Sequence, residues 1–202
     1  MVDTADVQVR PLAIDGAFEV RPTQHGDDRG VFLEWFRADV FRATAGHDLA
    51  LAQANCSVSR AGVIRGIHYS DVPPGQAKYV TCVGGTVWDV VVDLRVGSPT
   101  FGRWEAVVLD DEARCGLYLA EGLGHAFMSL APTATVVYLC STPYAPTHEH
   151  GIDPFDADLA VTWPTTGTDG DPLTPVLSEK DRDAPGLRAA LDAGSLPVWS
   201  AA

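Results

Sequence analysis

Basic residues are scarce in this 202-residue chain. It has 14 Lys and Arg against 27 Asp and Glu, which gives a formal net charge of −13. Surfaces that follow a nucleic-acid backbone need clustered Lys and Arg, so this scarcity argues against a nucleic-acid partner. It does not argue against a small anionic ligand, because a few cations focused in a pocket can bind a diphosphate within an acidic protein.

Long hydrophobic runs are lacking as well. The longest, such as Val90–Val92 and Val136–Leu139, are far too short to cross a bilayer. Met1–Leu12 carries early acidic residues and no apolar stretch, which predicts neither a signal peptide nor a membrane anchor. We therefore expect a cytoplasmic protein that does not bind membranes.

Patterns of metal ligands and cofactor cradles are weak or missing. The four cysteines are Cys56, Cys82, Cys115 and Cys140. They form no Cys-x-x-Cys pair, so buried reduced thiols are expected rather than zinc ligands or disulfides. His148 and His150 flank Glu149, but one His-x-His among Pro and Thr is weak evidence for a metal, and a solvated loop is the favoured interpretation. Gly-x-Ser-x-Gly and Gly-x-Gly-x-x-Gly motifs are absent, and we expect no metal and no other cofactor.

Short apolar or alternating segments between turn residues are what the chain has in abundance. Nineteen Gly and fourteen Pro are spread along it, and its length suits one domain over residues 1–202. The expected strands are Ala17–Arg21, Val31–Phe36, Ala50–Ser59, Val63–Tyr69, Ala77–Val83, Thr86–Leu94, Trp104–Leu109, Gly116–Leu119, His125–Leu130 and Thr135–Cys140. Only two helices are expected, at about Arg37–Ala45 and Pro185–Ala193, with an exposed loop at 164–176. This pattern predicts an all-β sandwich or barrel such as a jelly roll.

Polar side chains alternate along one expected strand. Gln53, Asn55 and Ser57 would all point to the same face, because side chains in a strand alternate with a period of two. Such a face either meets solvent or binds a polar ligand. For these three residues alone, the solvent-exposed face is the favoured interpretation.

Two further positions could bring titratable groups together. Arg65 and His68 are three residues apart, so a regular strand would place them on opposite faces. A bend or bulge near Gly66 would bring both to one cavity. His125 lies between glycines and an apolar strand, and Asp89 could be its partner, although a lone histidine in that setting is more often a core residue.

Taken together, these segments resemble the dTDP-4-dehydrorhamnose 3,5-epimerase family. The matching motifs, in the family's order over about residues 10–190, are Asp28-Arg29-Gly30 with Phe32 and Glu34, Gln53–Ser59, Gly62–Tyr69, Pro74–Val80, Asp89–Gly102, Gly122–Phe127 and Leu177–Asp181. The resemblance implies a cupin-type jelly roll with a few short helices, a homodimer, and no cofactor. It also implies epimerisation of a dTDP-4-keto-6-deoxy-hexose at C3 and C5. Residues 191–202 would form a C-terminal tail.

The resemblance implies roles for four catalytic side chains. His68 would be the base that removes a proton next to the ketone, and Asp181 would orient its ring. Lys78 would stabilise the enolate oxygen. Tyr138 would donate a proton to the opposite face of the sugar carbon.

The resemblance also implies a set of substrate contacts. Arg65 would hold the diphosphate as a bidentate guanidinium, and Tyr144 would stack on thymine. The remaining contacts would come from Gln53, Asn55, Ser57, Lys180, and the buried pair His125 and Asp89. Arg29, Phe32 and Glu34 resemble a segment that reaches into the neighbouring subunit's site; the alternative for Arg29 and Glu34 is a surface ion pair.

Two departures from the family pattern keep alternatives open. Ser70 stands where the family often has Gln, and Gly124 and Ala126 flank His125 where the family often has Ala and Gly. Both changes resemble variants from antibiotic deoxysugar pathways, some of which invert only C3 or only C5. A monoepimerase is therefore the main alternative, and a catalytically inactive cupin that binds a sugar nucleotide is a distant one.

Overall fold

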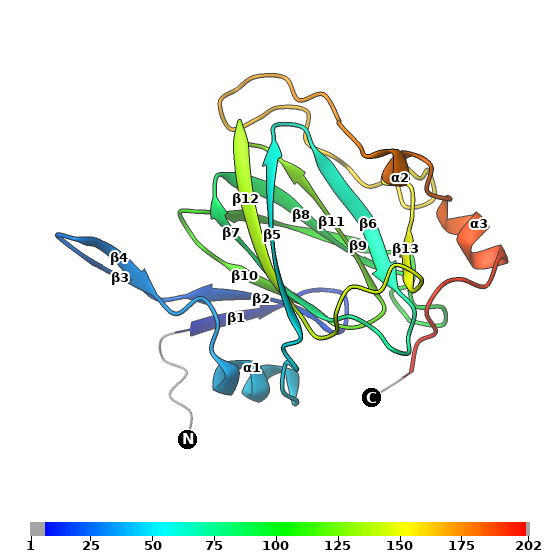
Figure 1. The fold of residues 1–202 in the computed structure, drawn as a ribbon, viewed down its shortest axis with the longest axis horizontal. Helices are drawn as coiled ribbons and strands as arrows, with labels where there is room; N and C mark the ends of the chain where they lie inside the picture. The colour runs from blue at the N-terminus through cyan, green and yellow to red at the C-terminus, as the bar shows by residue number, and fades with distance from the viewer. Residues whose placement is uncertain (1–6, 201–202) are drawn as a thin grey trace.

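Strands dominate the computed structural model, which describes residues 7–200 (Figure 1). Residues 1–6 and 201–202 lie outside the described residues. They include part of the N-terminal segment expected to carry no signal peptide and the end of the expected C-terminal tail. Two sheets pack face to face, and a two-stranded hairpin projects from them. The expected all-β jelly roll with a few short helices is confirmed. No helix among residues 7–200 is long and apolar enough to cross a membrane.

The first sheet has six antiparallel strands. Across the sheet they are β1 (Val7–Pro11), β2 (Ala17–Pro22), β10 (Gly116–Leu119), β7 (Lys78–Gly84), β12 (Thr133–Cys140) and β5 (Gln53–Arg60). Apart from β1 and β2, neighbours in this sheet are not consecutive in sequence, which is typical of a jelly roll rather than of a simple meander. β12 lies between β7 and β5, and its register places Tyr138 opposite both Asn55 and Val80.

The second sheet has five antiparallel strands. Across the sheet they are β13 (Glu149–Gly151), β6 (Ile64–Ser70), β11 (Leu123–Ser129), β8 (Thr86–Asp93) and β9 (Trp104–Asp110). β13 is an edge strand of three residues. The sequence did not predict β13, β1 or the hairpin strand β3 (Gln24–Asp27). β3 and β13 carry no apolar run in which a period of two could be seen, whereas Val7 and Val9 of β1 do alternate with polar residues, but over only five residues.

Each sheet is buried on both faces, because its side chains alternate between two hydrophobic clusters. Val80, Phe127 and Val136 belong to the cluster between the sheets. The outer face of the five-stranded sheet is covered by the segment after β13, through residues such as Trp163 and Leu187. Phe18, Tyr79 and Tyr118 lie on the outer face of the six-stranded sheet, packed against Phe41. The central strands that flank the cavity described below are thus covered on both faces, whereas the edge strand β5 leaves Cys56 and Val58 exposed on its outer face.

Three short helices occur in the described residues. α1 (Ala38–Ala45) matches the first expected helix and ends at Gly46, whose φ of 78° is the left-handed conformation that glycine adopts readily. α3 (Leu187–Asp192) lies within the second expected range. The expectation of only two helices is wrong, because α2 (Glu179–Arg182) begins after Ser178, whose hydroxyl accepts a hydrogen bond from the backbone N–H of Asp181. Four residues are too few to show a helical period.

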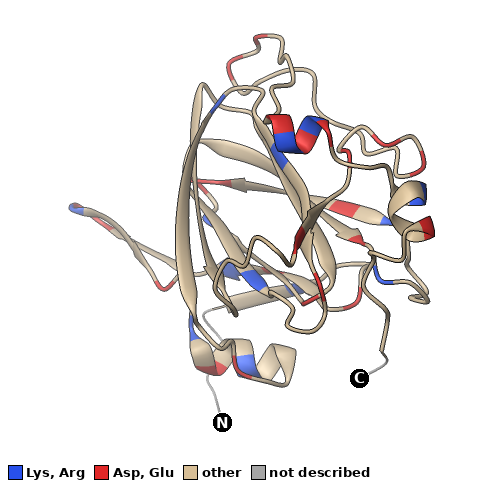
Figure 2. Ribbon diagram, turned by 45° about the vertical axis from the view of Figure 1, so that its right-hand side comes forward, with Lys and Arg blue, Asp and Glu red and all other residues tan. Residues whose placement is uncertain are grey.

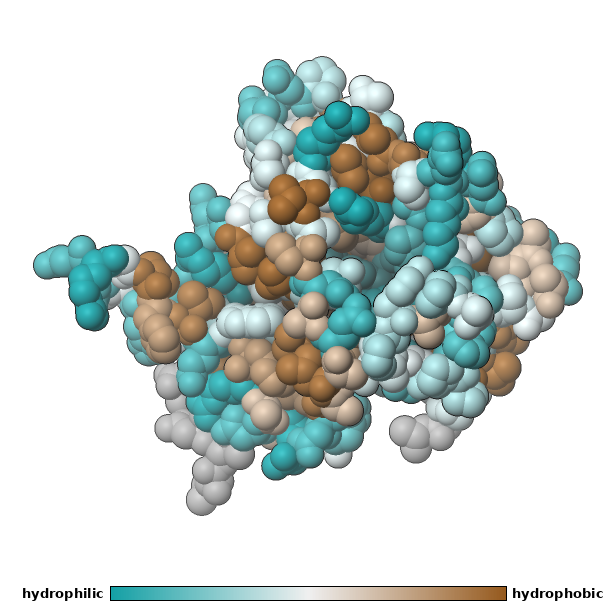
Figure 3. Space-filling view, viewed as in Figure 1, coloured by the Kyte–Doolittle hydropathy of each residue, from teal (hydrophilic) through white to brown (hydrophobic). Residues whose placement is uncertain are grey.

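The hairpin of β3 and β4 (Gly30–Leu33) extends away from the body of the protein (Figure 1). Its tip is hydrophilic, and hydrophobic side chains follow behind the tip (Figure 3). Phe32 is 68% exposed and Val31 is 51% exposed. Arg29 pairs with Asp27 across the turn. The hairpin therefore presents two large apolar side chains to solvent in the single chain.

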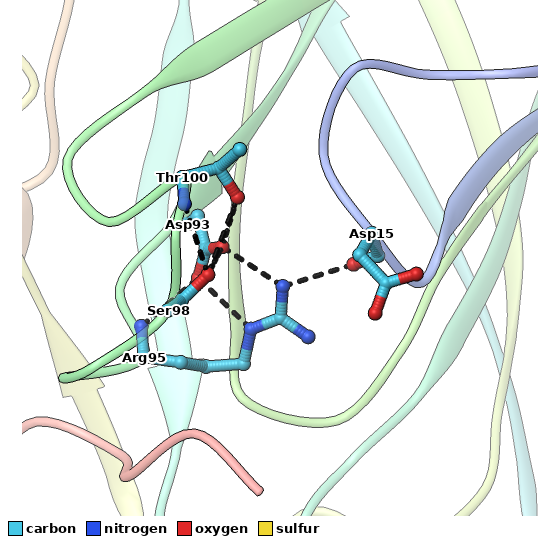
Figure 4. Close-up of polar contacts among 5 residues, drawn as sticks. All are labelled: Asp15, Asp93, Arg95, Ser98 and Thr100. Carbon is cyan, nitrogen blue, oxygen red and sulfur yellow. Dashed lines mark hydrogen bonds and ion pairs between the residues drawn. The ribbon is translucent and has the colours of Figure 1, made fainter. Parts of the chain in front are cut away.

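Asp93, at the end of β8, organises the loop that follows it. Its carboxylate accepts hydrogen bonds from the backbone and guanidinium of Arg95 and from the hydroxyls of Ser98 and Thr100 (Figure 4). Arg95 also donates to the backbone oxygen of Asp15 in the first loop. Burial raises the pKa of Asp93, but these hydrogen bonds outweigh it and the net shift is downward. This part of the Asp89–Gly102 motif therefore has a structural role.

The cysteines are all free thiols. Cys82, Cys115 and Cys140 are buried, as expected, and burial raises the pKa of Cys82 and of Cys115 to about 11. The expectation of a buried thiol is wrong for Cys56, which is exposed because β5 forms the edge of its sheet.

Candidate active site

A cavity of about 590 Å³ opens between the two sheets. Its lining residues are Gln53, Asn55, Cys56, Ser57, Arg65, His68, Gln76, Lys78, His125, Phe127, Tyr138, Tyr144, Glu149, Ser178, Lys180 and Asp181. Lys and Arg are few and separated along the chain (Figure 2). Three of them nevertheless line this one cavity, so positive charge is focused there within an acidic protein.

The six-stranded sheet supplies the polar wall of the cavity. Gln53, Asn55 and Ser57 share one face of β5 and all line the cavity, so the alternation seen in the sequence does mark one polar face. The solvent-exposed interpretation of that face is wrong, since each side chain is partly buried. Ser57 Oγ is buried without a hydrogen-bond partner in the described residues. Lys78 enters the cavity from β7, and Tyr138 enters from β12.

A β-bulge shapes the opposite wall. In the pairing of β6 with β11, His125 lies opposite His68 and Phe127 lies opposite Arg65, so β6 has one extra residue between these pairs. Gly66 occupies the bulge with a φ of 115°, and a Cβ there would lie 2.4 Å from the backbone oxygen of His125. The bulge brings Arg65 and His68 to the same cavity.

His68 and Asp181 form a pair at the edge of the cavity. The two side chains meet at 2.6 Å between His68 Nε2 and Asp181 Oδ1. Asp181 comes from α2, which lies beside the five-stranded sheet (Figure 2). Burial raises the pKa of Asp181, but hydrogen bonds from His68, Ser178 and the backbone of Gly66 lower it, and the net shift is downward. The carboxylate therefore stays ionised and holds a proton on Nε2, which leaves Nδ1 unprotonated in the neutral ring.

His125 and Asp89 form a second pair deeper in the fold. His125 Nε2 lies 2.8 Å from Asp89 Oδ1, and Asp89 is fully buried. The other carboxylate oxygen, Oδ2, has no hydrogen-bond partner in the described residues. Burial raises the pKa of Asp89, and the charges of His125 and Lys78 only partly oppose this.

Lys78 and Tyr138 have pKa values shifted in opposite directions by the same cause. Burial lowers the pKa of Lys78, while the negative charges of Glu149, Cys140 and Asp89 raise it in part. Burial also raises the pKa of Tyr138, which keeps its hydroxyl protonated near neutral pH. Burial therefore shifts both groups toward their uncharged forms, the amine of Lys78 and the phenol of Tyr138.

The rim of the cavity carries the other expected contacts. Tyr144 is 57% exposed, and its backbone N–H donates to Gln53 Oε1 at 2.8 Å. Arg65 Nε donates to Ser59 Oγ at 3.0 Å, which fixes the guanidinium at the cavity wall. Lys180 lines the cavity from α2. An aromatic ring and two cations therefore surround the entrance.

Three expected site residues lie elsewhere in the single chain. Arg29 and Phe32 belong to the projecting hairpin, and Glu34 follows it. None of the three lines the cavity. Glu34 instead lies 3.6 Å from Arg37 in an exposed ion pair.

Several lining residues were not anticipated as site residues. They are Cys56, Gln76, Phe127, Glu149 and Ser178. Four of them lie within the recognised motifs, which could have indicated them. Glu149 was noticed only as the residue between two histidines. The solvated loop expected there is wrong for Glu149 and His150, which belong to β13. It is right for His148, which precedes the strand and whose side chain is 47% exposed, although His148 contacts Asp71 as His150 does. Among residues 7–200, no cluster of three His, Cys, Asp or Glu side chains is arranged to hold a metal ion.

Comparison with known proteins places this site in a family. The model of the dTDP-4-dehydrorhamnose 3,5-epimerase family matches residues 11–189. A dTDP-4-dehydrorhamnose 3-epimerase of Streptomyces niveus is 54% identical, over 96% of this chain and 90% of that protein. A dTDP-4-dehydrorhamnose 3,5-epimerase of Mycobacterium tuberculosis is 51% identical, over 96% of this chain and 94% of that protein.

A solved structure agrees in both sequence and fold. The structure of a 3′-monoepimerase from Streptomyces bikiniensis in complex with dTDP-quinovose is 51% identical. It superimposes with a TM-score of 0.88, covering 94% of this chain and 92% of that one. With the match to the family model over residues 11–189, these similarities show that the chain belongs to the dTDP-4-dehydrorhamnose 3,5-epimerase family.

Proposed function

We propose that this protein is an isomerase that epimerises a dTDP-linked 4-keto-6-deoxy-hexose at C3 and C5, next to the ketone, without a cofactor. The observation that carries the proposal is the convergence of His68, Asp181, Lys78 and Tyr138 on one cavity. A cavity of about 590 Å³ lies within the usual range for a small-molecule site. Family membership supports the same reaction class.

His68 is the proposed base. A proton next to a ketone is a weak acid, so its removal requires a base positioned close to it and stabilisation of the enolate that forms. Asp181 fixes the tautomer of His68 and stabilises the imidazolium that appears when the ring takes the proton. The ammonium of Lys78 would stabilise the negative charge on the enolate oxygen.

Tyr138 is the proposed acid. His68 lies on the five-stranded sheet and Tyr138 lies on the six-stranded sheet, so the two side chains reach the cavity from opposite walls. Inversion of a carbon centre requires removal of a proton from one face and its return to the other. The two walls provide that arrangement.

The nucleotide would bind at the rim. Arg65 and Lys180 supply positive charge for a diphosphate, and the exposed ring of Tyr144 offers a stacking surface for thymine. Gln53, Asn55 and Ser57 would add neutral hydrogen bonds. His125 would line the sugar end of the pocket, held from behind by Asp89, which is fully buried and does not itself line the cavity.

A second copy of the chain would complete the site. The projecting hairpin carries Arg29 and Phe32 away from their own cavity, with Glu34 at its base. We propose a homodimer in which this hairpin contacts the partner's substrate. The cytoplasmic location and the single domain over residues 1–202 stay predictions.

Inversion at a single centre is the second candidate. Relatives named 3-epimerase and 3,5-epimerase are 54% and 51% identical to this chain, so overall identity does not separate the two activities. Ser70, whose hydroxyl bonds to Glu149 in the cavity wall, stands at one of the departures from the family pattern. A departure inside the cavity wall is a reason to consider a narrower specificity.

Proton NMR in deuterated water tests the function. The protein is incubated with dTDP-4-keto-6-deoxyglucose, and the signals of H3 and H5 are followed. Deuterium at both positions would support inversion of both centres, and deuterium at one position would identify a monoepimerase. Absence of exchange at both positions would contradict the proposal and favour an inactive binding protein.

Tyr138→Phe separates proton removal from proton return. We expect deuterium exchange to persist while the inverted product forms on the order of 10²-fold more slowly, because the base is intact and the acid is missing. The matched control is Tyr118→Phe, since Tyr118 lies in the cluster on the outer face of the same sheet. Equal losses of exchange and inversion would contradict the role of Tyr138 as the acid.

A further inference from the structure

The edge strand β13 has two different faces. Its register places Glu149 opposite Ser70 and His150 opposite Tyr69 on β6. Because side chains alternate, Glu149 faces the cavity while His148 and His150 face the outer side. The His-Glu-His triplet therefore presents its acid to the site and its two histidines away from it.

The two histidines converge on one carboxylate. Asp71 Oδ2 lies 3.0 Å from His148 Nδ1, and Asp71 Oδ1 lies 2.7 Å from His150 Nε2. The backbone N–H of Asp71 also donates to the backbone oxygen of His148 at 3.0 Å. The ring of His150 stacks on Tyr69 with 5.2 Å between ring centroids. We call Asp71, His148 and His150 the Asp71 clamp.

The cavity side of β13 carries a separate set of contacts. Ser70 Oγ donates to Glu149 Oε1 at 2.9 Å, which orients the carboxylate from the neighbouring strand. Glu149 and Lys78 line the same cavity from opposite sheets. An edge strand of three residues has few contacts of its own, so the position of Glu149 depends on what ties β13 to β6.

We propose that the Asp71 clamp is a positioning site, which holds β13 against β6 so that Glu149 faces Lys78 in the cavity. The contacts that establish this arrangement are independent of the reaction; its catalytic consequence rests on the proposed function. Asp71, which follows β6, is paired with two histidines at once, so it holds both His150 in β13 and His148 immediately before the strand. Hydrogen bonds to an ionised carboxylate are stronger than neutral ones, which suits a short strand at a sheet edge.

The charge state of Lys78 reports the position of Glu149. The groups that act on the Lys78 ammonium are Glu149 from β13, Cys140 from β12 and Asp89 from β8. His68, His125 and Tyr138 line the same cavity. Burial lowers the pKa of Lys78, and Glu149 is the largest of the charges that raise it. If Glu149 moves away, Lys78 loses its proton at a lower pH.

The sequence makes this measurement simple, because the chain has only two lysines, Lys78 and Lys180. Selective ¹³C labelling of lysine gives two side-chain signals in NMR, and Lys180→Arg assigns them. The protein is titrated with pH as wild type, Glu149→Gln, Asp71→Asn, and the double variant His148→Gln/His150→Gln. Asp192→Asn, an exposed position on α3, is the control for loss of one negative charge.

We expect Glu149→Gln to lower the pKa of Lys78, and Asp71→Asn and the double histidine variant to lower it in the same direction by less. The double histidine variant distinguishes a displacement of β13 from a change of charge near Lys78. Replacing the two histidines removes no negative charge, so a change of charge alone would raise the pKa of Lys78 or leave it unchanged, whereas release of β13 lowers it. Asp192→Asn should leave the titration unchanged.

Three results would overturn the proposal. The first is a Lys78 titration that Glu149→Gln does not change. The second is a clamp variant that leaves Lys78 unchanged while Glu149→Gln shifts it. The third is an upward shift in the double histidine variant. The Lys180 signal in each sample shows whether the cavity is still folded.

The rate of deuterium exchange gives the catalytic consequence. We expect Asp71→Asn to lower kcat by between about 10- and 100-fold, since small displacements around a reacting centre have effects of that size. The basic limb of its pH profile should also move to lower pH. Failure of the wild-type protein to exchange would contradict the proposed function alone, because the lysine titration needs no substrate.

Discussion

The two histidine–aspartate pairs of the cavity are built from the same side chains in different surroundings. The His68 side chain is 34% exposed, and its partner Asp181 receives hydrogen bonds that lower the pKa of the carboxyl. The His125 side chain is 10% exposed, and its partner Asp89 is fully buried with one oxygen unpaired. Burial raises the pKa of Asp89, so the same pairing gives two different electrostatic states.

This difference assigns different tasks to the two pairs. Asp181 is itself buried, but a carboxylate that accepts several hydrogen bonds stays ionised and can stabilise an imidazolium during proton transfer, as the His68–Asp181 pair requires. A carboxyl that burial holds toward its neutral form gives a new positive charge on His125 less support. We therefore expect the first pair to move protons and the second to position the substrate.

The largest effect should come from removing one histidine of each pair. His68→Asn should lower the rate of deuterium exchange on the order of 10³-fold, because the base is lost. His125→Asn should mainly raise KM and lower the rate far less. NMR exchange rates at saturating substrate compare the two variants, and equal losses would contradict the division of tasks.

We expect the second-largest loss of activity from replacing the aspartate of each pair by asparagine. An amide at position 181 can donate to His68 Nε2, which would move the ring proton to Nδ1 and remove the basic nitrogen. Asp181→Asn should then lower kcat on the order of 10²-fold. Asp89→Asn keeps an acceptor for His125 and should have a smaller effect. Steady-state kinetics decide this, and a larger loss in Asp89→Asn would reverse the assignment.

The pH dependence of stability should have opposite signs for the two carboxyl groups. Asp181 has a lowered folded pKa, so it stabilises the protein above its ordinary value of 3.8, and this is lost as the pH falls through the folded value. Asp89 has a raised folded pKa, so its contribution falls as the pH rises from 3.8.

Urea unfolding between about pH 3 and pH 7 measures this difference. Relative to wild type, Asp181→Asn should become less stable as the pH rises, and Asp89→Asn should become more stable. The acid-induced loss in wild type should be reduced in Asp181→Asn. Parallel pH profiles for the two variants would contradict the opposite shifts.

We expect the smallest effect from removing the side chain that caps the N-terminus of α2. Ser178→Ala removes the hydroxyl that accepts from the backbone N–H of Asp181, and should lower the free energy of unfolding by about 1 kcal/mol. Exchange should slow several-fold, because Asp181 is less firmly held. Ser178→Thr is the control, since it retains a capping hydroxyl. The buried pair has no such cap, because β8 and β11 hold both of its residues.

Much of the fold could be predicted from local pattern. The central strands have alternating or continuous apolar residues bounded by turns, and β10 matches its predicted range, Gly116–Leu119. The missed elements are short: β13 has three residues and α2 has four. Their positions come from contacts with β6, and a period cannot be recognised over so few residues.

The site was partly predictable for a physical reason. Alternation alone places Gln53, Asn55 and Ser57 on one face, and a glycine between Arg65 and His68 permits the bulge. Family resemblance supplied Asp181, which is 113 positions from its histidine. Glu149 was missed because its orientation depends on Asp71, and a sequence does not show which of two alternating faces meets a cavity.

The position of Asp181 has a consequence for synthesis of the chain. The carboxylate that orients the base follows it by 113 positions in the sequence, so it is synthesised long after the base. The same C-terminal segment covers the outer face of the five-stranded sheet. A nascent or truncated chain that ends before this segment therefore lacks both part of its core and its ionised partner for His68.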